Sequence, residues 1–572
     1  MWWLTPALSP SGAVVIQTIS SNTVDFLTPN STTADGDLRY RALLLCQGII
    51  NAHDEHNSFL PFFYIDVRDG KLCCQHSSWA LDDSIFRNIS ALARVYKITG
   101  RAELLPHLRH MIASAERSLD IGDGVNAADD RALMHNMSRG LMALSAMAEI
   151  DDRALWTARL DRFITRLMEI YSTPGWETGQ EYVLATKSWR SHEASPATCG
   201  RTIVGLVRCY KITHDERAIE LARRFIRVNL ACFDDAGQPQ ESAGVHFHSI
   251  ADTLQGILSY AELTEDRALI EKCELIYRKG LKSHGVDATG WFAEHIHHEN
   301  ASGCDVLSNC FSGDLRTGGE ICCTANMISC AILLGRAGYA HAFEDAERWI
   351  RNMLFASQLL DLSTVNISAT DEPRWPDFQQ RLIGNVAGFP SSNAAYDPTS
   401  PHLTQLCCPA QAAESLCDAW ESAAISTASD LNVNLFFSSD IVTSHLPRTG
   451  NIIITPKKNT AVRIKTPSWS PPDAYKLRIG PRRVDAIAAM NTDGYLYLGH
   501  CRAGEPIEFR FDLPHYKTTE SHSLQPAVNF HWRGNTIVDC HPRSDLLPLF
   551  ADRADLKKKP VPKRHRICKP TV

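Results

Sequence analysis

The stretch EDRALIEKCELIYRKGL, residues 265–281, decides the fold that the sequence predicts. An acidic turn caps the start of a helix, and apolar residues then recur at helical spacing. The same Arg-Ala tag begins at Arg101, Arg153, Arg217 and Arg267, at intervals of 52, 64 and 50 residues. A period of this length fits one hairpin of two helices per repeat.

Repeated helical hairpins stack either as an open solenoid or as a closed toroid. The irregular spacing favours the toroid, as do long loops rich in Gly, His and Trp, such as residues 171–200, YSTPGWETGQEYVLATKSWRSHEASPATCG. We therefore predict a mainly α protein in which residues 36–430 form an (α/α)6 barrel. Functional loops are expected at one rim of it.

After about residue 430 the apolar residues alternate with period two, as in NIIITP, AVRIKTPSW and PIEFRFDLP, with Pro, Gly and Asp-Gly turns between them. This pattern predicts a β-sandwich over residues 431–555. Residues 1–35 form an N-terminal segment whose GAVVIQTI is a candidate strand of the same sandwich. Residues 556–572 form a basic tail that we interpret as solvated.

Composition narrows the possible functions. The chain has 572 residues, 44% of them hydrophobic, and a formal net charge of -7, so nothing attracts it as a whole to nucleic acid or an anionic membrane. It has no run of eighteen apolar residues, and its start lacks the basic region of a signal peptide. We expect a cytoplasmic protein that acts on a small molecule or an oligosaccharide.

The cysteines are the residues of this sequence that indicate a metal-binding or catalytic site. Without a secretory signal, most of the eighteen cysteines are expected to be reduced and buried. Two doublets, Cys322/Cys323 and Cys407/Cys408, lie about ninety residues apart, and Glu320 stands two residues before Cys322. Three thiolates and one carboxylate would fill a tetrahedral zinc shell. The alternative is that these are small core residues, since a further doublet, Cys73/Cys74, occurs with no other sign of a metal site.

Three motifs occur in order: GGEICCTANMISCAILL at 318–334, CCPAQ at 407–411, and a strand region with VRIKTPSW and DGYLYL. In this order the chain resembles glycoside hydrolase family 127, the β-L-arabinofuranosidases, from roughly residue 40 to 515. The resemblance implies a zinc ion held by Glu320, Cys322, Cys407 and Cys408. It further implies that the Cys407 thiolate is the nucleophile of a retaining glycosidase, in place of the usual carboxylate.

The same resemblance implies a general acid, which protonates the leaving oxygen. In TGWFAEHIHHENASG, Glu299 lies ten residues after Thr289, at the family's offset, and Glu294 is the alternative acid. The interval from Glu299 to Glu320 is 21 residues, about five longer than the family's, so an insertion is expected between them.

Three further residues are candidate substrate contacts: His248, Arg201 and His297. His248 stands where the family has a sugar-contacting histidine, although a histidine at a helix start is the alternative. Arg201, in CGRTIVGLVRC, replaces a family histidine. A guanidinium there suggests an acidic sugar, unless it forms a structural ion pair.

These observations favour a zinc-dependent glycoside hydrolase that acts on a β-L-arabinofuranoside or a related, acidic sugar. Two alternatives remain open. One is an enzyme of the same fold in which zinc acts as a Lewis acid on a small metabolite that is not a carbohydrate. The other is a non-catalytic protein in which zinc only stabilises the toroid.

Overall fold

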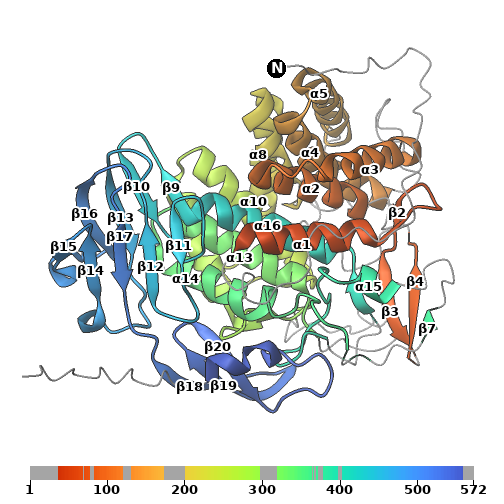
Figure 1. Ribbon diagram of the computed structural model, residues 1–572. Helices are drawn as coiled ribbons and strands as arrows, with labels where there is room; N and C mark the ends of the chain where they lie inside the picture. The colour runs from red at the N-terminus through yellow and green to blue at the C-terminus, as the bar shows by residue number, and fades with distance from the viewer. Residues whose placement is uncertain are drawn as a thin grey trace, which may run out of the picture.

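The structure is a computed structural model of the chain (Figure 1). It describes residues 37–68, 70–77, 83–119, 130–172, 200–296, 318–363, 365, 369–370, 378–396 and 402–557. The N-terminal candidate strand and most of the basic tail lie outside these residues.

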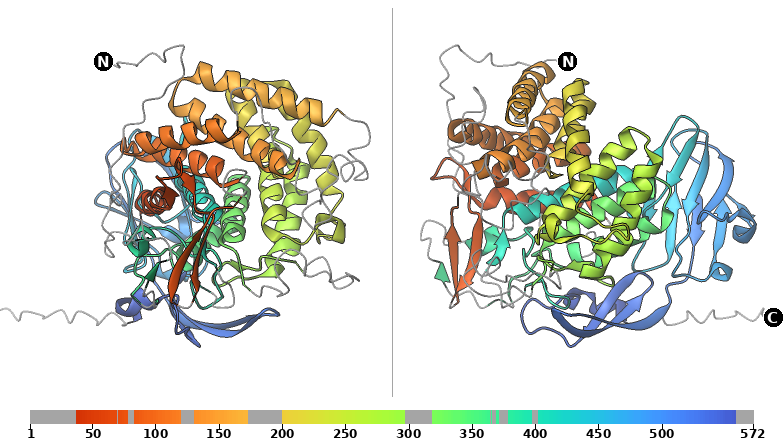
Figure 2. Two further views of the ribbon diagram at one scale, coloured as in Figure 1. Left: turned by 90° about the vertical axis from the view of Figure 1, so that its right-hand side faces the viewer. Right: turned by 180° about the vertical axis from the view of Figure 1, so that it is seen from behind.

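Two concentric sets of helices form a closed toroid, seen end-on in the left view of Figure 2. The inner helices are α2 (Ile85–Thr99), α4 (Asp130–Ile150), α8 (Thr202–Thr213), α10 (Phe247–Leu263), α13 (Ile321–Arg336) and α16 (Cys407–Ala423). Each inner helix packs on the next, and α16 returns to α2, which closes the circle. The outer helices are α1 (Leu38–Asn51), α3 (Leu104–Leu119), α5 (Arg153–Ile170), α9 (Glu216–Leu230), α11 (Arg267–Leu275) continued by η4 (Ile276–Leu281), and α14 (Ala340–Trp349) continued by η6 (Ile350–Leu354). The predicted toroid is confirmed.

The repeated tag of the sequence marks the turn from an inner to an outer helix. Asp152, Asp215 and Asp266 accept hydrogen bonds from the first backbone N–H groups of α5, α9 and α11. Each of these short turns follows the end of an inner helix, so they all lie at the same rim of the toroid.

Small residues let the inner helices approach closely. A Cβ atom on Gly205 of α8 would lie 2.9 Å from the Leu141 Cβ of α4. On Gly256 of α10 it would lie 2.8 Å from the Ile203 Cβ of α8. A larger side chain at either position would force neighbouring helices apart.

Two sheets form the predicted β-sandwich around a core of their own, beside the toroid in Figure 1. One sheet has the strand order β16-β13-β10-β9 and the other β11-β12-β17-β14-β15. The strands are β9 (Ala424–Ser426), β10 (Asp430–Val433), β11 (Val442–Ser444), β12 (Asn451–Ile454), β13 (Thr460–Lys465), β14 (Lys476–Ile479), β15 (Arg482–Val484), β16 (Tyr495–Cys501) and β17 (Ile507–Arg510). The pair β10 and β13 is parallel, and the other pairs of these two sheets are antiparallel.

A third sheet, β18 (His515–His522), β19 (Gln525–Arg533) and β20 (Thr536–His541), packs differently. Its Val528, Phe530 and Ile537 side chains belong to the core of the toroid rather than to that of the sandwich. The range predicted for the sandwich, 431–555, therefore contains two structural units. Period two predicts a half-buried strand, but it does not say which surface the strand covers.

Short elements cover the rim at which the inner helices begin. The sheet with strand order β7-β4-β3-β8 consists of β3 (Tyr64–Arg68), β4 (Lys71–Gln75), β7 (Ala369–Thr370) and β8 (His402–Gln405). Strand β8 leads directly into α16, so this sheet fixes where α16 starts. In the described part of the chain no helix is both long and apolar enough to cross a membrane.

Glu347 of α14 joins the three units. Its Oε2 accepts a hydrogen bond of 2.9 Å from the Phe436 backbone N–H of the sandwich side, and its Oε1 accepts one of 3.0 Å from Asn535, between β19 and β20. Arg351 pairs with the same carboxylate at 3.1 Å, and both side chains are buried. Breaking a buried pair leaves the remaining charge uncompensated.

We expect Glu347→Ala to lower the free energy of unfolding by about 3 to 5 kcal/mol, because Arg351 and Asn535 lose their shared acceptor. Thermal unfolding followed by circular dichroism measures the change. The matched control is Glu271→Ala, which removes an exposed pair with Arg267 and should leave the melting temperature nearly unchanged. Equal effects of the two substitutions would contradict the role of Glu347.

Candidate active site

The site lies where the inner helices begin. Glu320 directly precedes α13, Cys322 lies in the first turn of α13, and Cys407 and Cys408 open α16. One ligand atom from each of these four residues lies within 4.8 Å of the other three. All four residues are buried. We call them the Glu-Cys cluster.

The sulfur atoms of the cluster are in mutual contact. Cys322 Sγ lies 3.8 Å from Cys407 Sγ and 3.5 Å from Cys408 Sγ. Cys408 Sγ lies 3.9 Å from Glu320 Oε1, and the two neighbouring sulfurs of α16 are 4.0 Å apart. Such a set of one carboxylate and three sulfur ligands suits a tetrahedral divalent metal.

Cys407 differs from its neighbours in acidity. Burial raises the pKa of this thiol, but hydrogen bonds from the Cys322 and Cys408 thiols and the charge of Arg87 outweigh it and lower the pKa to about 6. Gln405 donates a further hydrogen bond of 3.2 Å to Cys407 Sγ. Burial instead raises the pKa of Cys322 and of Cys408. Cys407 is therefore the thiol of the cluster that ionises first.

A second group of ligand atoms adjoins the cluster. Atoms of His246, Glu294 and Glu320 lie within 4.8 Å of one another, and His246 Nε2 is 3.5 Å from Glu320 Oε2. Burial raises the pKa of Glu320. The imidazole of His246 is held from its other side, where Nδ1 lies 2.8 Å from Arg201 Nη2 and 2.7 Å from Ser249 Oγ.

Beneath the cluster, six side chains form a closed circuit of hydrogen bonds and ion pairs, which we call the buried polar ring. Its members, in order, are Asp83, Arg87, His248, Asn326, Asp252 and Arg139. The lengths in that order are 2.7, 2.9, 2.6, 3.2, 2.5 and 3.4 Å, the last closing the circuit. The ring joins α4, α10 and α13 to α2 and the turn that precedes it.

The ring fixes the state of His248. Arg87 can only donate, so His248 Nε2 accepts its hydrogen bond and Nδ1 donates to Asn326 Oδ1. Burial and the neighbouring Arg87 charge lower the pKa of His248 well below its ordinary value. Arg87 also donates to Gln411, one turn after Cys407, at 2.8 Å. The ring is thereby tied to α16.

The structure can be compared with the predicted site residues one by one. It brings Glu320, Cys322, Cys407 and Cys408 together. His248 lies in the polar ring, and Arg201 contacts His246. His297 and Glu299 lie outside the described residues.

Sequence reasoning missed His246, Arg87 and Gln405. His246 was detectable, because it stands two residues before His248 in VHFHS. Arg87 is one arginine in an ordinary helical pattern, and nothing in its sequence neighbourhood distinguishes it.

Comparisons with known proteins point to one family for this fold. Residues 192–418 match the family model described as the β-L-arabinofuranosidase GH127 catalytic domain. A GH127 β-L-arabinofuranosidase from Geobacillus stearothermophilus T6 superimposes with a TM-score of 0.58 at 12% sequence identity, covering 88% of this chain and 85% of that one. A second solved structure, a GH127 β-arabinofuranosidase, gives a TM-score of 0.55 at 14% identity, covering 88% of this chain and 82% of that one. No curated protein matches the sequence.

The toroid, its rim site and the family match define the class of the protein: it is a glycoside hydrolase. More narrowly, residues 192–418 match the GH127 catalytic domain, and the family resemblance seen in the sequence is confirmed. The matched range includes Glu320 and the three cysteines of the cluster.

We expect Cys407 in metal-free protein to react with iodoacetamide at a rate that rises with pH through a midpoint of about 6 and then levels off. Below the midpoint the thiol is protonated and poorly nucleophilic, and above it the thiolate dominates. Mass spectrometry of peptides after timed alkylation measures the profile. Cys322 should stay unmodified over this range, and a Cys407 midpoint near 9 would contradict the lowered pKa.

Proposed function

We propose that the protein is a zinc-dependent retaining glycoside hydrolase that acts on a β-L-arabinofuranoside or a related sugar, with the Cys407 thiolate as nucleophile. The observation that carries the proposal is the Glu-Cys cluster: four ligand atoms within 4.8 Å, one of them a thiol whose pKa lies near 6. The family match supplies the reaction class and the substrate class.

The residues of the cluster fit a zinc ion. Three sulfurs and one carboxylate form a donor set that prefers zinc to Mg²⁺ or Ca²⁺. Without a cation, burial keeps Cys322 and Cys408 protonated, because the pKa of each thiol is raised. Bound zinc would supply the positive charge that holds the sulfurs as thiolates at neutral pH. The N-terminal ends of α13 and α16 favour negative charge at the same place.

The chain's own residues then perform two displacements. Cys407 Sγ attacks the anomeric carbon and forms a C–S bond, while the C–O bond to the leaving group breaks with its electron pair. A general acid gives its proton to the departing oxygen. The resulting carboxylate takes a proton from water, the water oxygen attacks the same carbon, and the thiolate leaves. Two inversions give net retention.

Two glutamates compete for the role of acid. Glu299 is the residue predicted from the family offset. Glu294, the alternative, is buried beside His246 and Glu320. A carboxyl in such a place can exchange a proton near the nucleophile.

The residues beside the Glu-Cys cluster also influence which sugar can bind. Arg201 Nη2 bonds His246 and Ser249, so this nitrogen serves to orient His246. We therefore propose His246 as a sugar contact that Arg201 positions. This arrangement suits a neutral sugar. The acidic sugar suggested by the sequence would have to bind its carboxylate to the other nitrogens of the Arg201 guanidinium.

Elemental analysis of purified protein should find about one zinc per chain. Cys322→Ser and Cys408→Ser should lose it, because each substitution removes a thiolate from the shell. Cys417→Ser is the matched control: Cys417 is equally buried on α16 but lies outside the cluster, so zinc should be retained. Zinc that is indifferent to all three substitutions would refute the site.

With an aryl β-L-arabinofuranoside as substrate, we expect Cys407→Ser to reduce kcat by more than about 10³-fold. Cys417→Ser should retain activity. Proton NMR of the product formed in methanol should show the methyl glycoside with retained configuration. An inverted product would exclude Cys407 as the nucleophile, and activity only on a substrate that is not a carbohydrate would favour the Lewis-acid alternative.

The acid is identified in the same assay by the leaving group. Glu299→Gln and Glu294→Gln are compared on an alkyl glycoside and on a dinitrophenyl glycoside, whose leaving oxygen needs no proton. In kcat/KM, which reports the first displacement, the variant that lacks the true acid should lose about 10² to 10⁴-fold on the alkyl glycoside and far less on the dinitrophenyl glycoside. Equal losses on both substrates indicate a structural residue.

A further inference from the structure

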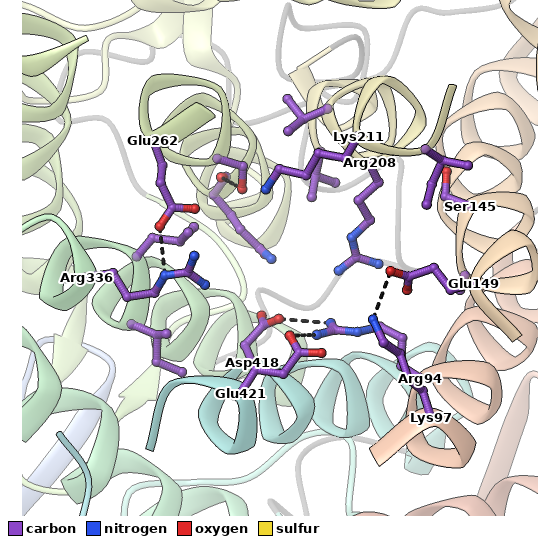
Figure 3. Close-up of a pocket in the computed structure, with 18 residues that line it drawn as sticks. Arg94, Lys97, Ser145, Glu149, Arg208, Lys211, Glu262, Arg336, Asp418 and Glu421 are labelled. Carbon is purple, nitrogen blue, oxygen red and sulfur yellow. Dashed lines mark hydrogen bonds and ion pairs between the residues drawn. The ribbon is translucent and has the colours of Figure 1, made fainter. Parts of the chain in front are cut away.

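The opposite end of the toroid holds a cavity of about 180 Å³, lined by residues of all six inner helices (Figure 3). Nothing in the proposed hydrolysis uses it. From Cys407 to Glu421 on the shared helix α16 the axial distance is about 21 Å, so the two sites lie at opposite rims. The charged side chains that line the cavity are Arg94, Lys97, Arg208, Lys211, Arg336, Glu149, Glu262, Asp418 and Glu421.

Most of these charges are paired across neighbouring helices. Lys97 pairs with Glu149 at 2.8 Å, and Arg336 pairs with Glu262 at 2.7 Å. Arg94 reaches Asp418 at 2.9 Å. Basic residues are stabilising here, because helix C-termini carry partial negative charge.

Below these pairs, buried Glu414 occupies the next layer of the toroid. It accepts hydrogen bonds from Arg94 Nη1 at 2.6 Å, from Arg208 Nη2 at 2.8 Å and from Ser90. These charges lower the pKa of Glu414, although burial opposes the shift. The carboxylate is thus fully engaged, and its partners are held in place.

Three donors at the cavity nevertheless lack an acceptor among the described residues. Arg208 Nη1 and Ser145 Oγ are buried without a hydrogen-bond partner, and Ser145 is only 3% exposed. Lys211 Nζ forms no hydrogen bond or ion pair with described residues, and no dashed line reaches it in Figure 3. Arg208 and Lys211 lie three residues apart on α8, and therefore on one face. Ser145 stands on the adjacent helix α4.

The charge balance selects the class of ligand. Four carboxylates of the lining pair with Arg94, Lys97 and Arg336, and Glu414 below them neutralises Arg208, so Lys211 is the one cation of the lining without a paired carboxylate among the described residues. A doubly charged anion would overcompensate it next to six helix C-termini. The volume holds roughly six waters, which is room for a carboxylate with a few carbon atoms.

We propose that this cavity is a second ligand site, which binds a small monocarboxylate through Arg208, Lys211 and Ser145. The carboxylate accepts hydrogen bonds from the three free donors. Hydroxyl groups on the ligand donate to the acidic side chains of the same wall, so a hydroxy acid fits better than a purely apolar acid. The site is separate from the one that cleaves the glycosidic bond.

Isothermal titration calorimetry of the full chain, in a buffer free of carboxylates and phosphate, tests the proposal with acetate, glycolate and inorganic phosphate. We expect one saturable site for glycolate. Lys211→Met should raise its Kd about tenfold, since a charged hydrogen bond is lost without unpairing any neighbour. Lys457→Met, on the exposed surface of the sandwich, is the matched control and should bind normally.

Two further variants keep the outcome decisive. Ser145→Ala removes one buried hydroxyl and should raise the Kd severalfold, even if Lys211→Met fails to fold. Cys407→Ser should bind glycolate as the unmodified chain does, because the active site is not involved. Absence of saturable binding, or a Kd unaffected by both Lys211→Met and Ser145→Ala, would overturn the proposal. Tighter binding of phosphate than of glycolate would overturn its preference for a monoanion.

Discussion

The buried polar ring is the constraint on which the rest of the toroid depends. Arg87 and Arg139 carry positive charge into the centre of the protein, and Asp83 and Asp252 balance it there. Buried charges are tolerated only when each is paired and hydrogen-bonded, so the helices that carry them can meet in one register only. That register sets where each inner helix begins. Since Arg87 also reaches α16, the position of the Cys407 sulfur follows from it.

Much of the fold could be predicted from the sequence, because its signals are local. Helical periodicity and capped acidic turns predicted the hairpins, and alternation predicted the strands. The assignment of β18, β19 and β20 to the sandwich went further than the signal allowed: alternation identifies a strand but not its packing partner. The core formed by Val528 and Phe530 depends on long-range contacts that no short window contains.

The candidate site was predictable to the extent that its chemistry is unusual. Adjacent cysteines near a glutamate are rare enough to be noticed, and the structure places Glu320, Cys322 and Cys407 together. Their supporting residues are of common types. Arg87 acts through His248, a partner 161 positions away in the chain. The spacing of residues along the sequence does not reveal such a pairing. The substrate contacts are the least predictable part, since they depend on loops as well as on helices.

All six inner helices run in the same direction, and this has a consequence for how the enzyme can diverge. At the rim where they end, the chain crosses to an outer helix through minimal turns, such as the one between α4 and α5 at Asp151 and Asp152. At the rim where they begin, it returns through longer segments, such as residues 231–246 between α9 and α10. Insertions can therefore accumulate on one side of the molecule without disturbing any helix contact. Substrate range can evolve there while the scaffold and the opposite rim stay unchanged.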